Sequence, residues 1–326
     1  MRRIGASLWV AALAIGWAAL AIAEEPEKAQ GKGYTAWPFD AAEAKRRQEE
    51  TARALGEKVE KDVDLGGGVK LTLVLIPAGE FLMGSAETSE ELARLYSRFK
   101  AEAKWFDDEH PQHRVRITRP FWMGKYEVTQ EQWEAVMGNN PSKFKGPKNP
   151  VETVSWDEAQ AFLQRVNARV TGGGFALPTE AQWEYACSAG SGTRFSFGND
   201  EALLHKHGNY ADRNTNFPWS DKEADDGFAQ TAPVGRYLAN AFGLHDMHGN
   251  VWEWCSDWYG EKYYGTSVSS DPAGPPEGQY RVLRGGSWPS VLPMYCRCAC
   301  RGRNVPAVRV GSYGFRVVWV SSARTP

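Results

Sequence analysis

The sequence predicts an α+β fold in which long ordered loops outweigh regular helices and strands. Three helix starts are well marked, and all of them precede residue 191. From residue 191 to 322 the pattern changes to short strands and long loops, so helices and strands do not alternate as in an α/β chain. The composition agrees, because 33 glycines, 18 prolines and 14 tryptophans among 326 residues favour many turns and few long helices.

The three predicted helices begin with the same arrangement of capping residues. Ser155 is followed three residues later by Glu158, and Thr129 and Thr179 are each followed by a glutamine at that spacing. A hydroxyl at the N-cap and a Glu or Gln three residues further on accept hydrogen bonds from each other's backbone N–H groups. We therefore expect helices to begin directly after these three hydroxyl residues.

Residues 24–66 form a polar lead ahead of the main domain, which we place at 67–322. Within the lead a short helix is predicted over 40–55, because Asp40 can cap its start and Gly56 can end it. The apolar face of this helix is weak, so we interpret it as a solvated spacer, with a partner-binding helix as the alternative.

Apolar and β-branched runs predict the strands of the main domain. Residues 69–76 and 81–84 are separated by a turn that contains proline and glycine. Residues 115–117 and 121–128 follow the same pattern further along, whereas the charged stretch 87–104 is compatible with a helix. Loops as long as those after residue 191 are uncommon in a compact domain, so we expect aromatic side chains or metal ions to hold them.

The N-terminus has the pattern of a secretory signal peptide, predicted over residues 1–23. Arg2 and Arg3 provide a basic start, an apolar run follows, and Ala21 and Ala23 supply the small residues typical of a cleavage site. A retained single-span anchor is the alternative, because the run is nearly long enough to cross a bilayer. We expect cleavage, and therefore an exported chain without a membrane span.

The charge balance gives no electrostatic argument for nucleic-acid binding. Lys and Arg together number 38, Asp and Glu number 40, and the formal net charge is -2. A chain with this balance lacks the basic surplus that neutralises phosphates or anionic membrane surfaces. We therefore expect no nucleic-acid partner.

Residues 243–254 alternate tryptophan, glycine and isolated charges without the periodicity of a helix or a strand. Each indole needs apolar cover and a hydrogen-bond partner for its N–H group, which indicates a closely determined loop structure. Glu253 lies between Trp252 and Trp254, where an unpaired carboxylate would be costly to bury. The tract therefore predicts a cation beside Glu253, either an arginine or a metal ion.

Five cysteines are present, and three of them alternate along the segment 296–300. If this segment is a strand, all three thiols point to one face. They would then be small buried hydrophobic residues, with or without a disulfide to one of the two remaining cysteines, or they would form a metal-thiolate or redox site. An odd number also allows a disulfide to another chain. The five are Cys187, Cys255, Cys296, Cys298 and Cys300.

A series of motifs resembles the formylglycine-generating enzyme family, also called the sulfatase-modifying factors. The resemblance extends from about residue 69 to 320 and becomes specific because many short motifs occur in the same order. It implies one domain of the C-type-lectin-like class, with small antiparallel sheets and long ordered loops. The motifs are Ile76–Ser85, Glu109–Pro111 with His113, Tyr126–Thr129, Asn149–Val151, Val154–Trp156, Leu177–Glu184, the tryptophan tract, Arg284–Trp288 and Tyr313–Trp319.

The resemblance implies two calcium sites with structural roles. Calcium prefers hard oxygen ligands from carboxylates, amides and backbone carbonyls, and both sets of residues offer these groups. The alternative is that the acids are turn caps and surface charges. The first site would use the side chains of Asn209 and Asp226 with the carbonyls of Tyr210 and Phe228. The second would use the side chains of Asp246 and Glu253 with the carbonyls of Gly249 and Val251.

The sequence departs from the family at the copper centre of its oxidases. The resemblance implies two thiolates that hold copper while a substrate cysteine is oxidised to formylglycine, and soft thiolates suit Cu(I). Ser290 stands where the first thiolate is expected, and the position of the second falls near Pro293. We take Ser290, Cys296 and Cys298 as the candidate catalytic residues, and copper as a doubtful cofactor.

Three functions remain open at this point. The chain is a non-canonical enzyme or binding module of this family without the copper-dithiolate centre, acting on an unknown peptide or protein. Alternatively, it is a copper-dependent oxidase whose site has shifted to Cys296, Cys298 or Cys300. A purely ligand-binding protein of lectin type is the third hypothesis, although the chain has no Glu-Pro-Asn sugar-binding motif.

Arginines and histidines add candidates of lower specificity. Seven arginines between residues 281 and 316 are expected to pair with acids such as Asp257 and Asp271, or to line an anion or peptide groove. The histidines occur partly in close pairs, but without a carboxylate at a metal-binding spacing. The resemblance extends to iron-binding sulfoxide synthases, whose iron histidines lie largely on a helical bundle that this chain lacks, so no three-histidine iron site is expected.

Overall fold

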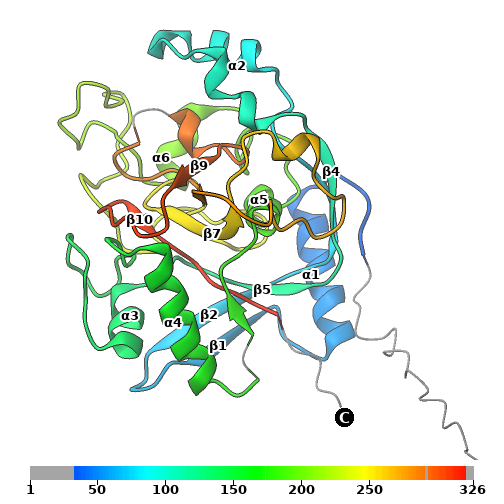
Figure 1. Ribbon diagram of the computed structural model, residues 1–326, viewed down its shortest axis with the longest axis vertical. Helices are drawn as coiled ribbons and strands as arrows, with labels where there is room; N and C mark the ends of the chain where they lie inside the picture. The colour runs from blue at the N-terminus through cyan, green and yellow to red at the C-terminus, as the bar shows by residue number, and fades with distance from the viewer. Residues whose placement is uncertain (1–32, 173, 291–292, 321–326) are drawn as a thin grey trace, which may run out of the picture.

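A five-stranded sheet forms the base of the molecule (Figure 1). The computed structural model describes residues 33–172, 174–290 and 293–320, so the signal peptide predicted over 1–23 lies outside the described part. All strand pairs in this sheet are antiparallel. Its strands, in spatial order, are β1 Glu60–Asp64, β2 Lys70–Ile76, β5 Phe121–Gly124, β11 Val318–Trp319 and β6 Phe175–Ala176.

Strand β2 divides its side chains between two hydrophobic cores. Leu71, Leu73 and Leu75 pack in one core with helices α3 Gln130–Met137 and α4 Trp156–Arg169. Val74 and Ile76 pack in the other core, with residues of α1 Ala41–Leu55 and α5 Glu180–Ser188. This division follows from the period of two in a strand, which sends successive side chains to opposite faces.

Two smaller sheets carry the remaining strands, and most of the loops surround them (Figure 1). In the four-stranded sheet, β10 lies parallel to β7 whereas the other pairs are antiparallel. The strand order of this sheet is β10 Tyr313–Gly314, β7 Trp252–Trp258, β8 Arg281–Arg284 and β9 Gly302–Asn304. The two-stranded sheet consists of β3 Gly79–Met83 and β4 His113–Ile117.

The helix starts predicted after Thr129, Ser155 and Thr179 are confirmed, each with both hydrogen bonds of the capping box. The charged stretch 87–104 forms only one short α-helix followed by two 3₁₀ turns. The remaining helices are α2 Ser89–Leu95 and α6 Leu204–His207, with 3₁₀ turns at Ser97–Phe99, Ala103–Trp105, Asp107–Glu109, Glu201–Leu203, Tyr263–Gly265 and Pro293–Cys296.

Helix α1 begins after Asp40 and ends at Gly56, as predicted, but it is not a solvated spacer. Gln48 is buried, and its amide donates to the carbonyls of Leu75 and Phe242 at 2.9 Å each. Because these acceptors lie on different segments of the main domain, the helix is attached to that domain. Among the buried residues of the helix, only the small apolar side chains of Ala44 and Ala52 add to this attachment from the two cores, which explains why the weak apolar face suggested a solvated helix.

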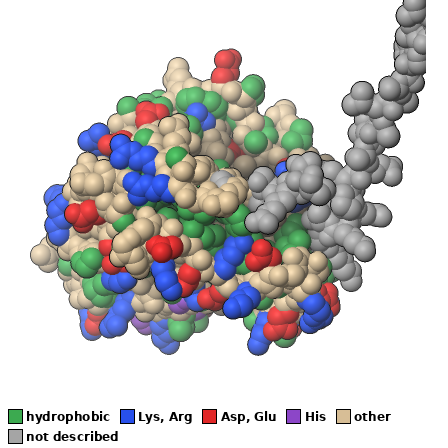
Figure 2. All heavy atoms as spheres, turned by 90° about the horizontal axis from the view of Figure 1, so that it is seen from below, with side chains coloured by type: hydrophobic (Ala, Val, Ile, Leu, Met, Phe, Trp, Pro, Cys, Tyr) green, Lys and Arg blue, Asp and Glu red, His purple; other side chains and the backbone are tan. Residues whose placement is uncertain are grey.

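The surface carries no single sign of charge. Figure 2 shows acidic and basic side chains interspersed over the visible face, as the net charge of -2 leads one to expect. Among the described residues, no helix combines the length and the apolar character that crossing a membrane requires.

Candidate functional site

The cation predicted beside Glu253 is Arg316. Its guanidinium donates to both carboxylate oxygens at 2.6 Å, and the indole of Trp183 donates to Oε2 at 2.8 Å. Glu253 and Arg316 are both fully buried. Because Oε1 accepts only one of these hydrogen bonds, it keeps a lone pair for a further partner.

Two more buried carboxylates lie close to this pair, and they outnumber the positive charges. Burial, followed by the charges of Asp246 and Glu253, raises the pKa of Glu127 well above its usual value. Burial also raises the pKa of Asp246 to about 6, against the opposing effect of Arg316. Glu127 was missed as a site residue at the sequence level, although it lies in one of the family motifs. A single guanidinium therefore faces three buried carboxylates.

The residues of the first predicted calcium site come together in the structure. The carboxylate of Asp226 accepts hydrogen bonds from the backbone N–H of Tyr210 at 3.0 Å and of Phe228 at 2.9 Å. Asn209 is fully buried, and its amide nitrogen donates to Gln230 and Asn250. Burial raises the pKa of the Asp226 carboxyl to about 7, because no nearby cation offsets the cost of burying its charge.

The two predicted calcium sites lie next to each other. The backbone N–H of Asn250 donates to the carbonyl of Asn209 at 2.8 Å. Gly249 has φ 136° and approaches so closely that a Cβ atom would lie 2.1 Å from the same carbonyl oxygen. Only glycine allows this approach, so the contact between the two sites requires a glycine at position 249.

Calcium fits the donor atoms that these residues leave free. Asn209 Oδ1 and Asp246 Oδ1 are both buried and without a hydrogen-bond partner, and both residues were chosen as ligands from the sequence. An unsatisfied buried oxygen is costly, and amide and carboxylate oxygens are the ligands that calcium prefers. If calcium is bound, these two oxygens, together with carboxylate and carbonyl groups of the neighbouring residues, would hold it.

The structure brings Ser290 and Cys296 together. Ser290 Oγ accepts a hydrogen bond from the backbone N–H of Ser287 at 2.8 Å, and the same N–H group lies close to the Cys296 thiol. Both side chains are buried. Burial raises the pKa of the Cys296 thiol, which keeps it protonated. Pro293, where the second thiolate of the family was expected, begins a 3₁₀ turn.

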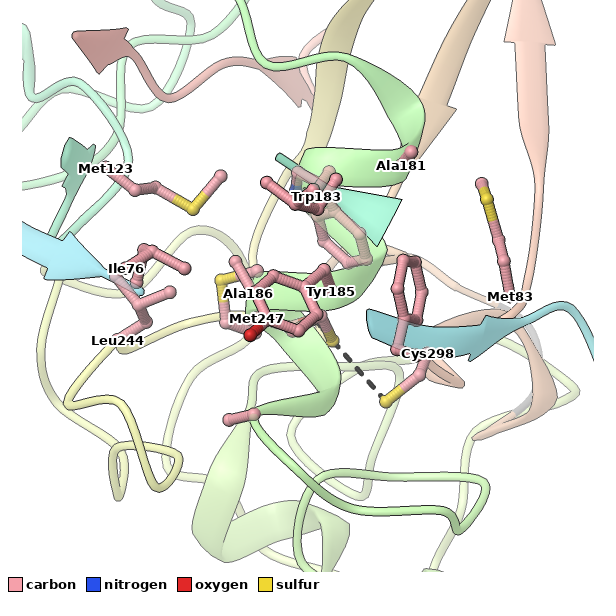
Figure 3. Packing of buried hydrophobic residues seen from close by; sticks show 14 of the residues in the cluster. Ile76, Met83, Met123, Ala181, Trp183, Tyr185, Ala186, Leu244, Met247 and Cys298 are labelled. Atoms are coloured by element: carbon pink, nitrogen blue, oxygen red, sulfur yellow. Dashed lines mark hydrogen bonds between the residues drawn. The ribbon is translucent and has the colours of Figure 1, made fainter. Parts of the chain in front are cut away.

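Cys298 does not lie with Ser290 and Cys296, because the segment 296–300 is a turn and not a strand. Its Sγ atom lies 3.5 Å from Sγ of Cys187 on α5. Figure 3 marks this contact of Cys298 with a dashed line. Cys298 also lines a cavity of about 180 Å³, together with Ser85, Glu184 and Arg194. The cysteines are free in the structure, so neither predicted disulfide partner, Cys187 or Cys255, is joined to this segment.

Buried arginines near the C-terminus pair with glutamates, and the expected pairs with Asp257 and Asp271 are absent among the described residues. Asp271 accepts hydrogen bonds from Thr118, and Asp257 accepts them from the backbone of Glu180 and from Ser256. Because buried charges need close partners, these ion pairs hold loops in place, and two of their members, Glu184 and Arg297, also line the cavity beside Cys298. The pairs are Arg284 with Glu180 and Glu184, Arg297 with Glu109, Arg301 with Glu180, and Arg316 with Glu253.

The fold and the arrangement of these motifs define a C-type-lectin-like domain stabilised by buried charges. Residues 69–321 match the sulfatase-modifying factor enzyme 1-like domain, and the chain belongs to that family. The formylglycine-generating enzyme of Streptomyces coelicolor is 38% identical over 203 residues, which are 60% of this chain and 60% of that enzyme. The chain thus spans less than two thirds of this relative.

Two solved structures share the fold over most of the chain. Treponema denticola variable protein 1 is 30% identical, with a TM-score of 0.64 over 80% of this chain and 99% of that one. PvdO from Pseudomonas aeruginosa is 25% identical, with a TM-score of 0.65 over 81% of this chain and 99% of that one. Each match covers nearly the whole of the solved protein, so the architecture of both proteins recurs in this chain.

Proposed function

We propose that this chain is an exported family member without a copper-dithiolate oxidase centre. It recognises a peptide or protein ligand, and it either only binds this ligand or catalyses a different reaction on it. The observation that carries the proposal is the hydroxyl of Ser290 at the position of the first copper thiolate. A hydroxyl is a hard ligand and does not replace a thiolate for Cu(I). The thiol beside it, Cys296, is buried, and burial raises its pKa, which keeps it protonated.

A turnover assay tests this proposal. The purified protein is incubated with copper, oxygen and a sulfatase-type peptide that contains a cysteine, and aldehyde formation is followed by mass spectrometry. We expect no aldehyde, whereas a formylglycine-generating enzyme run in parallel should convert the peptide. Aldehyde formation that persists in a Cys298→Ser variant would contradict the proposal, because it would show copper-dependent oxidation that does not need the Cys187–Cys298 pair.

A copper oxidase with a shifted site is the second candidate, because one cysteine of the segment 296–300 does have a second sulfur beside it. That cysteine is Cys298, and its partner is Cys187 at 3.5 Å. In this case the peptide should be oxidised by the wild-type protein and not by Cys298→Ser. Binding of the peptide without turnover in both proteins favours the binding module.

Calcium at the two predicted sites completes the proposal, with a structural role. The free oxygens of Asn209 and Asp246 support it, as does the excess of buried carboxylates around Arg316. Calcium would supply the missing positive charge and fix the loops that carry these residues. Isothermal titration of chelator-treated protein should give two bound ions per chain.

The proposal that the chain is exported rests on the sequence of residues 1–23. The intact mass of the protein recovered from its native source should correspond to a chain that begins near Glu24. A mass that includes the apolar run would favour the retained anchor.

A further inference from the structure

A cavity of about 180 Å³ lies between the end of α5, the turn after β3 and the segment that precedes α1. Trp37 and Leu82 are among its lining residues, whereas Ser290 and Cys296 are not. We propose that this cavity binds one neutral ring that is rich in hydroxyl groups, such as a hexopyranose at the end of a glycan. This inference is independent of the proposed function, because it concerns neither the peptide ligand nor the cysteines.

The charged side chains that line the cavity already have partners of opposite charge. A ligand with a net charge would therefore enter a partly buried site without a counter-charge, which is unfavourable. A ligand that is neutral overall avoids this cost and leaves the existing ion pairs in place. The pairs are Arg194 with Glu87, Glu184 with Arg284, and Arg297 with Glu109.

Arg194, which lines the cavity, has a donor without an acceptor. Its Nε atom is buried and has no hydrogen-bond partner, although Nη1 and Nη2 of the same side chain both donate. The hydroxyls of Ser191 and Thr193 also line the cavity, and they contact each other and the carbonyl of Phe195. With one proton each, these two hydroxyls keep lone pairs that can accept. A fitting ligand must therefore both accept and donate, and a hydroxyl group does both.

The apolar part of the cavity suits the C–H face of a sugar ring. The half-buried indole of Trp37 packs edge-to-face against Phe39 and Phe81, with ring centroids 5.5 Å and 5.8 Å away. These contacts fix the orientation of the indole, and Leu82 adds an apolar side chain that is 38% exposed at the rim. Apolar walls with a few placed polar groups are typical of small-ligand sites.

The volume of the cavity limits the ligand to a single ring. A protein cavity of about 150 Å³ can hold benzene, so about 180 Å³ has room for one six-membered ring whose hydroxyls partly face the polar wall and the solvent. A chain of several sugars would have to extend from the mouth beside Leu82. We therefore expect the cavity to bind one terminal sugar.

Saturation-transfer NMR with free sugars tests the site. We expect transfer from the protein to the ring protons of at least one of glucose, galactose, mannose and N-acetylglucosamine, with a millimolar Kd, and weaker binding of the charged glucuronate. Arg194→Gln should weaken binding at least about tenfold, because it removes the free Nε donor. The matched control is Arg98→Gln, which also removes an arginine paired with a glutamate but lies outside the cavity, and it should leave the Kd unchanged.

Four results would overturn the sugar site. They are no transfer to any of the four neutral sugars, tighter binding of glucuronate than of all four, an equal Kd in Arg194→Gln and Arg98→Gln, and loss of transfer on chelation of calcium while the circular dichroism spectrum is unchanged. The last result would place the sugar on a calcium ion. Should Arg194→Gln fail to fold, Leu82→Trp decides, because a larger side chain at this exposed rim position should block the cavity without disturbing the core. Aldehyde formation in the peptide assay would bear on the proposed function and leave this test unaffected.

Discussion

Arg316 and Glu253 form a fully buried bidentate ion pair between residues 63 positions apart, and this pair joins the two larger sheets. Glu253 lies on β7 of the four-stranded sheet. Arg316 also donates to the carbonyl of Gly124, at the end of β5 in the five-stranded sheet, and to that of His245. One guanidinium therefore connects both sheets with the tryptophan tract.

Loss of the guanidinium alone should be strongly destabilising. In Arg316→Met the carboxylate of Glu253 remains buried without its partner, which costs about 3–5 kcal/mol of unfolding free energy. Urea denaturation measures the loss. The control is Arg309→Met, which removes an exposed pair with Glu158 and should cost less than about 1 kcal/mol. A similar small loss in both variants would show that Arg316 does not compensate the buried charge.

Calcium should stabilise the protein through Asn209 and Asp246. At a calcium concentration about 100 times the Kd, binding to the folded state alone adds roughly 2.7 kcal/mol per site. Asn209→Ala and Asp246→Ala should each remove the response of one site in thermal denaturation with and without chelator. Asp225→Asn is the control, because Asp225 is exposed and pairs with Arg213. A response that is unchanged in all three variants would argue against both sites.

A thiol at position 290 should create a copper site beside Cys296. In Ser290→Cys the new sulfur would lie beside Cys296, because both side chains approach the backbone N–H of Ser287. Combining it with Cys298→Ser keeps the Cys187–Cys298 pair from contributing. Copper(I) affinity, measured by competition with a chromophoric chelator, should rise by at least about tenfold, or ~1.4 kcal/mol, over Cys298→Ser alone. An equal affinity would place the two side chains too far apart for one ion.

Asp257 should make stability depend on pH. Burial, and next the charge of Glu180, raises the pKa of the Asp257 carboxyl to about 7 from an ordinary value of 3.8. Between these values the folded protein holds a proton that the unfolded chain has released, so this contribution to stability is complete below about pH 4 and is lost as pH rises through about 7.

Asp257→Asn checks this pH dependence, because asparagine keeps an acceptor for the N–H of Glu180 and cannot ionise. Compared with wild type, the variant should gain stability as pH rises, by up to about 4 kcal/mol above pH 7 at about 1.4 kcal/mol per unit of pKa. Urea midpoints measured across this range give the difference. Parallel pH profiles for the two proteins would mean that Asp257 ionises normally in the folded state.

Local signals in the sequence were sufficient for the helix starts and for the class of fold. The hydroxyl and glutamine of a capping box lie within one turn, so Thr129 and Thr179 mark where their helices begin without reference to distant residues. The family motifs also placed the candidate calcium ligands, and the structure brings Asn209 and Asp226 with their neighbours into one region. Export and the ligand remain predictions.

The sequence by itself determined that Glu253 needs a cation and where three helices begin, and it predicts that Ser290 stands in place of a thiolate. Only the tertiary structure decided that the cation is Arg316 and that Cys298 faces Cys187, 111 residues away. It also decided that Glu127 joins the buried acids and that α1 packs on the domain. The reason is physical: capping and strand alternation act over a few residues, whereas a buried charge or thiol takes its partner from whichever segment the packed core brings within contact distance.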